Sequence, residues 1–388
     1  MSARDIILLD LDSVLVRPLG YRAALRATVD HFRARLGLPP DPPTEDEIEI
    51  FESCGFGSEW HAVPACVAQI LVEAGAALPG IWRETLDQTV DAVAHAALHL
   101  PRTAYGALIQ RIDAEAGADG KLAPLRALDY FIARTPPEAW PVLHELLGRT
   151  FDITAPATRV FQHYTLGSAR FPHTYGFGPD FNTESLLMAL DESLLSAQGR
   201  ALLLESGAPI AVYTARPSLP PPTAADRTGY APEAEMACEL LGLDGIPLVG
   251  FGHVSWLAQQ HGVQPDVYTK PSPVQALAAI GAAVEGAPDG VAPALQAARA
   301  LAAHGALEGP LAALGVCNGD VRVTVFEDTP GGAMAVRRAG EALRAAALPV
   351  RVRVVGVGAT DIKRRALEPV ADLLVADVNE GLRLALRP

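Results

Sequence analysis

Two aspartates follow the first apolar run of the chain, in "DIILLDLDSVLV", where Asp10 and Asp12 stand one residue apart. A short run rich in Ile and Leu predicts a buried strand. Side-by-side carboxylates at the end of such a strand are costly to bury, so they favour a reactive or cation-binding site. The alternative for an isolated D-x-D pattern is a turn or a helix cap.

Other polar residues stand at the ends of later apolar runs. Thr214 follows "APIAVY", and Glu327 with Asp328 closes "VRVTVFED", while Lys270 in "VYTKPSP" precedes a predicted helix. Taken singly, these residues fit a turn, an N-cap and a surface charge. Carboxyl ends of parallel strands meet at one edge of a sheet, so their joint order predicts that they share a site.

The apolar runs also predict the fold. Strand-like runs alternate with helical patterns after residue 205, which indicates an α/β fold with a doubly wound, Rossmann-like parallel sheet. Further strands are expected in "IPLVG", "RVRVVGVG" and, more weakly, "ADLLVAD". The Ala-, Gly- and Pro-rich stretch at 281–310 is expected to be a helical elaboration rather than a linker.

A long, mostly helical region separates the first strand from the others. Thr44 and Glu47, in "PTEDEIEIFESCG", have the spacing of a capping box. A chain of 388 residues exceeds the usual size of a single core. We therefore expect an α/β core domain formed by residues 1–16 and 193–388, and an inserted helical cap domain at residues 17–192.

Composition narrows the class of protein. The chain has 31 basic and 45 acidic residues, a net charge of −14, and a hydrophobic fraction of 49%. Such a chain can bury a core, and its charge disfavours binding to nucleic acid or to an anionic membrane. Its four cysteines (Cys54, Cys66, Cys238 and Cys317) lack the paired spacing of a zinc site. No apolar window is long enough to span a bilayer, so we expect a cytoplasmic protein. We also expect it to be a monomer or a homodimer.

The order of motifs resembles the haloacid dehalogenase (HAD) superfamily, in its magnesium-dependent phosphatase and β-phosphoglucomutase-like branch. "LLDLDSVLV", "IAVYTARP", "KPSP" and "VTVFEDTPGGAMAVRRAG" are similar to the four motifs of that family. The resemblance covers about half of the chain. The helical insertion occupies the place of the family's C1 cap, and it is far longer than a typical cap of this type.

The resemblance implies a mechanism. Asp10 would be the nucleophile that forms an aspartyl phosphate, and Asp12 the general acid and base. Lys270 would neutralise phosphate charge and hold Asp10. Thr214 and neighbouring amides, including that of Ala215, would bind the transferred group.

A cation is expected at the same edge. Two carboxylates about 4 Å apart repel by roughly 4 kcal/mol at an effective dielectric near 20, and this edge would gather four acids. Mg²⁺ prefers hard oxygen ligands and leaves positions for water and substrate. By the resemblance, its ligands would be the Asp10 and Asp328 carboxylates and the Asp12 backbone carbonyl, with Glu327 bound directly or through water.

Three features bear on the substrate. Arg216, in "TARPS", either reaches a second anionic group of the ligand or pairs with a surface acid. Glu59 and Trp60, in "ESCGFGSEWHAVP", lie where C1-cap relatives close a loop over the substrate, but Trp60 could equally pack in the core of the cap. "FPHTYGFGPDFN" is a hinge, a lid or a plain connection.

These observations predict a Mg²⁺-dependent phosphatase that acts on a small phosphorylated metabolite. A phosphomutase shares every motif and differs in returning the phosphate to the substrate. A haloacid dehalogenase fits less well, because Asp12 has no counterpart in that branch. In a third class, the chain keeps the scaffold as a binding module and uses its enlarged insertion to contact a partner.

Overall fold

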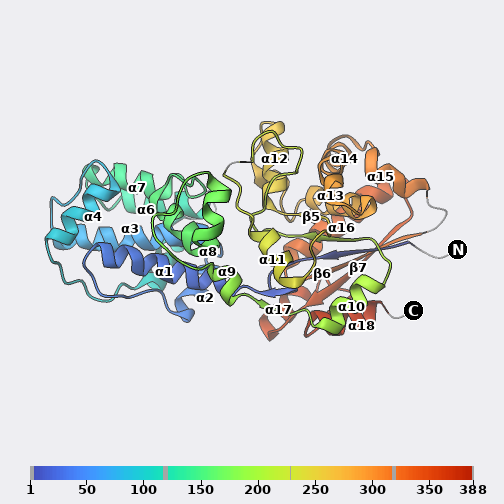
Figure 1. Ribbon diagram of the computed structural model, residues 1–388, viewed down its shortest axis with the longest axis horizontal. Coiled ribbons are helices and arrows are strands. Elements are labelled where there is room, and N and C mark those ends of the chain that lie inside the picture. The colour runs from blue at the N-terminus through green and yellow to red at the C-terminus, as the bar shows by residue number, and fades with distance from the viewer. Residues whose placement is uncertain (1–3, 117–120, 228, 317–319, 387–388) are drawn as a thin grey trace. The chain divides into compact units, whose positions relative to one another are not determined.

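The chain divides into two compact units. The computed structural model describes residues 4–116, 121–227, 229–316 and 320–386 (Figure 1). Met1–Pro18 and Asp191–Pro388 form the core unit, and Leu19–Leu190 form the helical unit. Cys317, one of the four cysteines noted in the sequence, lies outside the described residues.

A parallel sheet forms the centre of the core unit. Its strand order is β5-β4-β1-β6-β7-β8, and each neighbouring pair is parallel. The strands are β1 (Arg4–Leu9), β4 (Ile210–Tyr213), β5 (Leu248–Val249), β6 (Val321–Glu327), β7 (Val350–Val357) and β8 (Leu373–Val375). Every strand expected from the sequence is present, and the predicted α/β class is confirmed.

Helices cover both faces of this sheet, so the strands are apolar on both sides. Successive residues of β1 alternate between two buried clusters: Ile6 and Leu8 face one, and Ile7 and Leu9 face the other. The first cluster packs against α12 (Phe251–Gln260), α13 (Pro273–Glu285), α14 (Val291–His304), α15 (Gly309–Ala312) and α16 (Pro330–Ala345). The second packs against α10 (Ala197–Glu205), α11 (Glu233–Leu241) and α18 (Val378–Ala385).

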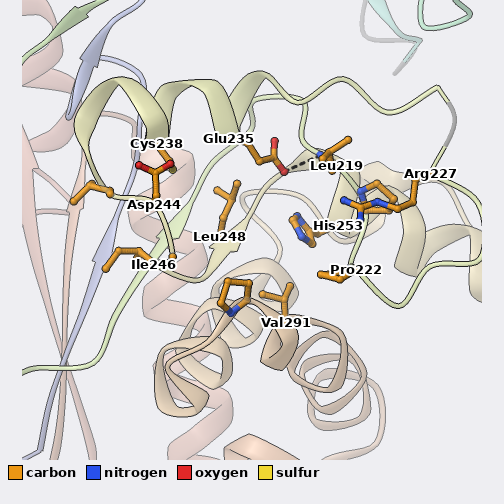
Figure 2. Close-up of a pocket in the computed structure, with 14 residues that line it drawn as sticks. Leu219, Pro222, Arg227, Glu235, Cys238, Asp244, Ile246, Leu248, His253 and Val291 are labelled. Atoms are coloured by element: carbon orange, nitrogen blue, oxygen red, sulfur yellow. Dashed lines mark hydrogen bonds between the residues drawn. The ribbon is translucent and has the colours of Figure 1, made fainter. Parts of the chain in front are cut away.

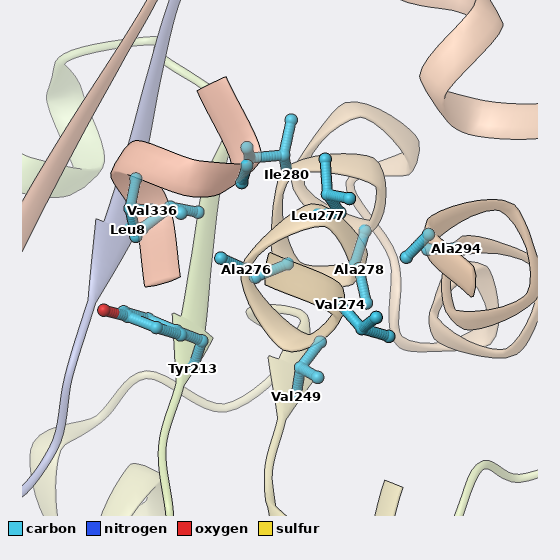
Figure 3. Close-up of a cluster of buried hydrophobic side chains, with 14 of the residues drawn as sticks. Leu8, Tyr213, Val249, Val274, Ala276, Leu277, Ala278, Ile280, Ala294 and Val336 are labelled. Carbon is cyan, nitrogen blue, oxygen red and sulfur yellow. The ribbon is translucent and has the colours of Figure 1, made fainter. Parts of the chain in front are cut away.

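Helix α13 is the centre of the first cluster. Figure 3 shows its apolar side chains between Leu8, Tyr213 and Val249 of the strands on one side and Ala294 of α14 on the other. Small alanine side chains let α13 and α14 approach closely, so the expected helical elaboration at 281–310 is confirmed. The core unit also holds α17 (Asp361–Leu367) and the 3₁₀ helices η2 (Pro265–Val267), η3 (Pro288–Gly290) and η4 (Ala313–Val316).

A short ribbon lies where the chain leaves the core unit and returns to it. β2 (Val16–Arg17) and β3 (Glu192–Ser193) pair in antiparallel fashion, with Val16 opposite Ser193 and Arg17 opposite Glu192. Unlike β5, which belongs to the apolar run "IPLVG", β3 contains no apolar residue that would predict a strand.

The helical unit is built from helices that pack around α3. Its elements are α1 (Leu19–Arg35), α2 (Glu45–Ser53), α3 (Glu59–Ala77), α4 (Leu86–His95), α5 (Tyr105–Ala116), α6 (Ala123–Ile132), η1 (Pro137–Ala139), α7 (Trp140–Leu147), α8 (Pro156–Tyr175) and α9 (Leu186–Leu190). The predicted capping box begins α2: Thr44 Oγ1 accepts from Glu47 N at 3.3 Å, and Glu47 Oε2 accepts from Thr44 N at 3.0 Å. Among the described helices of both units, none is long and apolar enough to cross a membrane.

The aromatic stretch "FPHTYGFGPDFN" packs as part of the helical unit. Its first residues complete α8, and Gly176 ends the helix in the left-handed region at a φ of 77°. Phe171 and Phe181 both contact the ring of the buried His163, at 3.7 and 4.8 Å between centroids. The stretch is therefore packed within the helical unit, and its role as hinge, lid or connection stays a prediction.

Candidate active site

Adjacent strands bring three carboxylates together in the core unit. β1 and β6 pair in parallel with Leu9 opposite Phe326, so Asp10 and Glu327 leave the sheet at the same level. Asp10 N donates to Phe326 O at 3.1 Å, which extends the ladder by one step. Asp10, Glu327 and Asp328 are all buried, and one oxygen from each lies within 4.8 Å of the other two.

Lys270 lies between two of these acids. Its Nζ is 3.0 Å from Asp10 Oδ2 and 2.9 Å from Glu327 Oε2, and it stands 3.9 Å from the centroid of the Tyr213 ring. Burial acts to lower the pKa of Lys270, but Asp10 and Glu327 more than offset this and raise it. The lysine is therefore a fixed positive charge that partly neutralises the cluster.

The net pKa shifts of Asp10 and Glu327 have opposite directions. Burial raises the pKa of Asp10 well above its usual value, and the Glu327 charge adds to this while Lys270 opposes it. Burial also acts to raise the pKa of Glu327, yet Lys270 and the hydrogen bonds from Thr329 and Tyr213 hold it below the usual value. Of Asp10 and Glu327, it is thus Glu327 whose negative charge the fold stabilises.

Hydrogen bonds occupy both oxygens of Glu327. Its Oε2 accepts from Tyr213 Oη at 2.6 Å and from Lys270, and its Oε1 accepts from Thr329 Oγ1 at 2.7 Å. Gly332, in the first turn of α16, leaves the space that this carboxylate fills, because a Cβ there would lie 2.2 Å from Glu327 Oε2. The second glycine of "TPGG", Gly332, is therefore required because the Glu327 carboxylate lies so close to its backbone.

Lys363 is a member of the site that the sequence analysis missed. Its Nζ contacts Asp328 Oδ2 from α17, the helix that follows β7. Burial raises the pKa of Asp328, and Lys363 opposes this shift. The available signal was position: "GATDIKRR" follows the carboxyl end of β7, the neighbour of β6 in the sheet.

Thr214 and Ala215 follow β4 at the same end of the sheet. Thr214 is buried, and its Oγ1 accepts from Arg216 N at 3.1 Å while its carbonyl accepts from Gln275 Nε2 at 2.8 Å. Ala215 is exposed between the two buried neighbours. This tight turn presents the hydroxyl and backbone of 214–216 beside the strand end that carries Asp10.

Arg216 is committed to two acids of the chain. Its Nε lies 2.8 Å from Asp12 Oδ1, and its Nη2 lies 2.9 Å from Asp191 Oδ2. Arg216 and Asp191 are both buried. Of the two roles that the sequence left open, an ion pair is the one observed, although Asp191 is buried rather than at the surface. Asp12 is held through the same guanidinium group.

Glu59 and Trp60 belong to the helical unit, whereas the other predicted site residues belong to the core unit. Trp60 is 7% exposed and stacks on Phe151 at 5.3 Å, with the edge of Phe161 at 5.7 Å. Glu59 is partly buried in the first turn of α3. The packing of Trp60 in the helical unit is the second of the two alternatives that the sequence left open, and the role of Glu59 and Trp60 in substrate binding stays a prediction.

Comparisons with known proteins bear on the fold. No family model matches the chain, and no curated protein matches it. A crystal structure determined as a target of the Northeast Structural Genomics Consortium is similar, with a TM-score of 0.62 and 14% identity over 99% of this chain and 98% of that one. Phosphatase Tt82 from Thermococcus thioreducens has a TM-score of 0.45 and 14% identity over 98% of each chain.

The first of these similarities supports the fold of the whole chain, including the insertion, because it extends over nearly all of both chains. At 14% identity it supports the fold alone. A TM-score below 0.5 does not establish a common fold, so the second similarity carries no argument. Function has to be argued from the residues of the site.

Proposed function

We propose that the chain is a Mg²⁺-dependent phosphatase of the HAD type, which hydrolyses a small phosphorylated metabolite through an aspartyl-phosphate intermediate. The observation that carries this proposal is the convergence of Asp10, Glu327 and Asp328 around Lys270. Four charged side chains from distant parts of the sequence meet at one end of a parallel sheet, where ligands of α/β proteins bind.

Asp10 is the proposed nucleophile. Its Oδ1 accepts from Leu11 N at 2.8 Å and its Oδ2 contacts Lys270, so the carboxylate has a defined orientation. Attack on phosphorus by a carboxylate oxygen forms the aspartyl phosphate and expels the alkoxide of the substrate. Lys270 favours the ionised form that this attack needs, against the effect of burial.

Asp12 is the proposed general acid and base. It would donate a proton to the departing alkoxide and later take one from the water that hydrolyses the acyl phosphate. Arg216 fixes Oδ1 of this carboxylate, so proton transfer is assigned to Oδ2. Thr214 Oγ1 accepts from the Arg216 amide, and its own proton is then directed to a phosphoryl oxygen, together with the Ala215 amide.

The donor set fits Mg²⁺. All three clustered side chains offer carboxylate oxygens, the hard ligands that this ion prefers. Asp10, Asp328 and the Asp12 carbonyl would hold it, while Glu327, whose oxygens accept hydrogen bonds, would act through the orientation of its neighbours. When bound, the ion would neutralise the phosphoryl oxygens and align them with Asp10.

Release of inorganic phosphate tests the proposal. The purified chain is assayed with phosphorylated sugars, acids and nucleotides in Mg²⁺, and again after exhaustive chelation. We expect turnover of at least one compound, loss of that turnover on chelation, and its recovery when Mg²⁺ is added. Formation of an isomeric phosphate without release of phosphate would identify a phosphomutase instead.

A matched pair of variants, one on β1 and one directly after it, identifies the nucleophile. Asp10→Asn removes the carboxylate from the site, whereas Asp5→Asn changes the same residue type in an exposed pair with Arg322. Asp10→Asn should abolish turnover and retain the folded state, and Asp5→Asn should retain both. Full activity of Asp10→Asn, turnover that persists without metal, or no turnover of the whole panel would each overturn the proposal.

A further inference from the structure

Tyr213 connects two strands that are not neighbours in the sheet. It is the last residue of β4, and its Oη donates to Oε2 of Glu327, the last residue of β6, at 2.6 Å. β1 lies between these strands, so their backbones are about 10 Å apart. Because Leu9 pairs with Val212 and with Phe326, Tyr213 and Glu327 are both level with Asp10. The tyrosine side chain therefore crosses the end of the strand that Asp10 follows.

The ring of Tyr213 also supports Lys270. Figure 3 shows the ring in the same apolar cluster as Leu8 of β1, on the side of the sheet that α13 covers. Lys270 Nζ lies 3.9 Å from the centroid of this ring, 3.0 Å from Asp10 Oδ2 and 2.9 Å from Glu327 Oε2. An ammonium group over an aromatic face is attracted by it. Tyr213 thus contacts the ammonium group directly and also binds one of its two carboxylate partners.

Glu235 shows how a buried carboxylate of the same unit behaves with fewer donors. It lines a separate cavity (Figure 2), where its Oε1 accepts from Leu219 N at 2.9 Å. Its Oε2 has no hydrogen-bond partner among the residues that the structure describes, and burial raises its pKa to about 7. Burial acts to raise the pKa of Glu327 as well, but Lys270 and two hydroxyl groups hold it below the usual value. The donors around Glu327 therefore keep it as an anion that attracts Lys270.

We propose that Tyr213 is a positioning residue, which holds Lys270 against Asp10 through its ring and through Glu327. The inference rests on the proposed function, because Asp10 is the proposed nucleophile. Without the hydroxyl, Glu327 Oε2 loses its shortest hydrogen bond, and Lys270 is free to follow the carboxylate away from Asp10. Attack on phosphorus needs a closely defined orientation of the carboxylate, and misplacement by about 1 Å costs on the order of a hundred-fold in rate.

Two variants separate the hydroxyl from the ring. Tyr213→Phe removes the hydroxyl and keeps the ring, whereas Tyr213→Leu removes both. We expect kcat to fall about ten-fold in the first and about a hundred-fold in the second, with KM changed by less than about three-fold. Steady-state kinetics in Mg²⁺, on the substrate that the phosphate-release screen identifies, measures both constants. Tyr213→Phe alone decides the question if Tyr213→Leu does not fold.

Tyr175→Phe is the matched control. Tyr175 is also buried, and its Oη donates to the buried Gln162 Oε1 at 2.9 Å in the helical unit. Its substitution removes the same kind of hydrogen bond and should lower the melting temperature, but it should leave kcat and KM unchanged. Circular dichroism establishes that each variant is folded. If kcat of Tyr213→Phe equals that of Tyr175→Phe, Tyr213 has no positioning role.

A second measurement needs no substrate. Denaturant unfolding gives the loss of stability caused by Tyr213→Phe in the parent chain and in Glu327→Gln. Hydrogen bonds to an ionised acceptor are about twice as strong as neutral ones, so the loss should be about half as large in Glu327→Gln. An equal loss in both backgrounds, with turnover intact in the parent chain, would overturn this inference alone. The expected coupling without turnover of any phosphate ester would overturn the proposed function, and the positioning role with it.

Discussion

Arg216 holds Asp12 by a guanidinium edge, with 2.8 Å between Nε and Oδ1, and the same guanidinium binds the buried Asp191. Asp191 is the first residue of the core unit after the helical unit. It directly precedes β3, whose partner β2 begins four residues after Asp12. The proposed general acid is therefore positioned through the segment that returns the chain from its long insertion.

Asp191→Asn should lower kcat without a matching change in KM. The amide keeps the volume of the side chain but weakens its hold on Arg216, which loosens Asp12. Misplacement of an acid or base by about 1 Å costs on the order of a hundred-fold in rate, so we expect a fall of about ten- to hundred-fold. Steady-state kinetics on the substrate found by the phosphate-release screen measures it.

Glu192→Gln is the control for this effect, because Glu192 forms an exposed pair with Arg17 one residue further along. It should leave both constants unchanged. If Asp191→Asn behaves like Glu192→Gln, Asp191 has no part in positioning Asp12.

Lys363→Met should increase the stabilisation that Mg²⁺ gives. In the metal-free chain Lys363 neutralises the buried Asp328, so its removal should lower the free energy of unfolding by about 1–3 kcal/mol. In Lys363→Met a bound cation supplies the charge that the lysine supplied, and it does not have to compete with the Lys363 ammonium group for Asp328. Mg²⁺ should therefore raise the free energy of unfolding of the variant more than that of the parent chain.

Melting curves of Lys363→Met in chelator and in Mg²⁺ measure both effects. Lys121→Met removes an exposed lysine paired with Asp129 in the helical unit, and its Mg²⁺-dependent shift should equal that of the parent chain. An equal shift in Lys363→Met as well would separate Lys363 from the metal site.

The sequence was sufficient to predict the sheet and the acids at its edge. Long runs of Val, Ile and Leu identify buried parallel strands, and Asp10 and Asp328 could be placed because strand ends converge in such a sheet. The order of the motifs also pointed to Lys270. These inferences need only local pattern and the rules of parallel sheets.

The rest of the site depends on contacts that leave no local signal. Tyr213 reads as an apolar residue of β4, yet its hydroxyl binds Glu327. Lys363 reads as a surface charge on a short helix. Trp60 could not be assigned because an aromatic residue near a glycine-rich loop fits both a ligand contact and a core, and its stacking on Phe151 is a contact that the sequence does not show.

Gly332→Ala should disrupt the site, whereas its neighbour should tolerate the same change. A Cβ at Gly332 would lie 2.1 Å from Glu327 Cδ, whereas one at Gly331 meets nothing within 4 Å. We expect Gly332→Ala to cost about 1–3 kcal/mol, as overpacking does, and to reduce turnover because Glu327 must move.

Gly331→Ala should be neutral or stabilising by up to about 1 kcal/mol, because alanine favours the helix. Denaturant unfolding and phosphate release compare the two variants. Loss of stability of the same size in both would mean that contact with Glu327 is not the cause.

Glu235 should make the chain less stable as the pH rises towards neutrality. Burial raises its pKa from 4.5 to about 7, with Arg227 opposing and Glu233 adding to the shift. Between these values the folded chain keeps a proton that the unfolded chain has released, so the free energy of unfolding falls with rising pH. Buried His253, whose pKa is lowered to about 3, has the opposite slope below pH 6.5, so the Glu235 effect has to be isolated by difference.

Glu235→Gln removes only the acid, and the neutral amide has no charge to bury. Relative to the parent chain, the variant should gain roughly 1–3 kcal/mol between pH 4.5 and 7, with most of the gain above pH 5. Denaturant unfolding of both proteins at several pH values gives this difference. A difference for Glu235→Gln that is independent of pH would show that the pKa of Glu235 is the same in the folded and the unfolded chain.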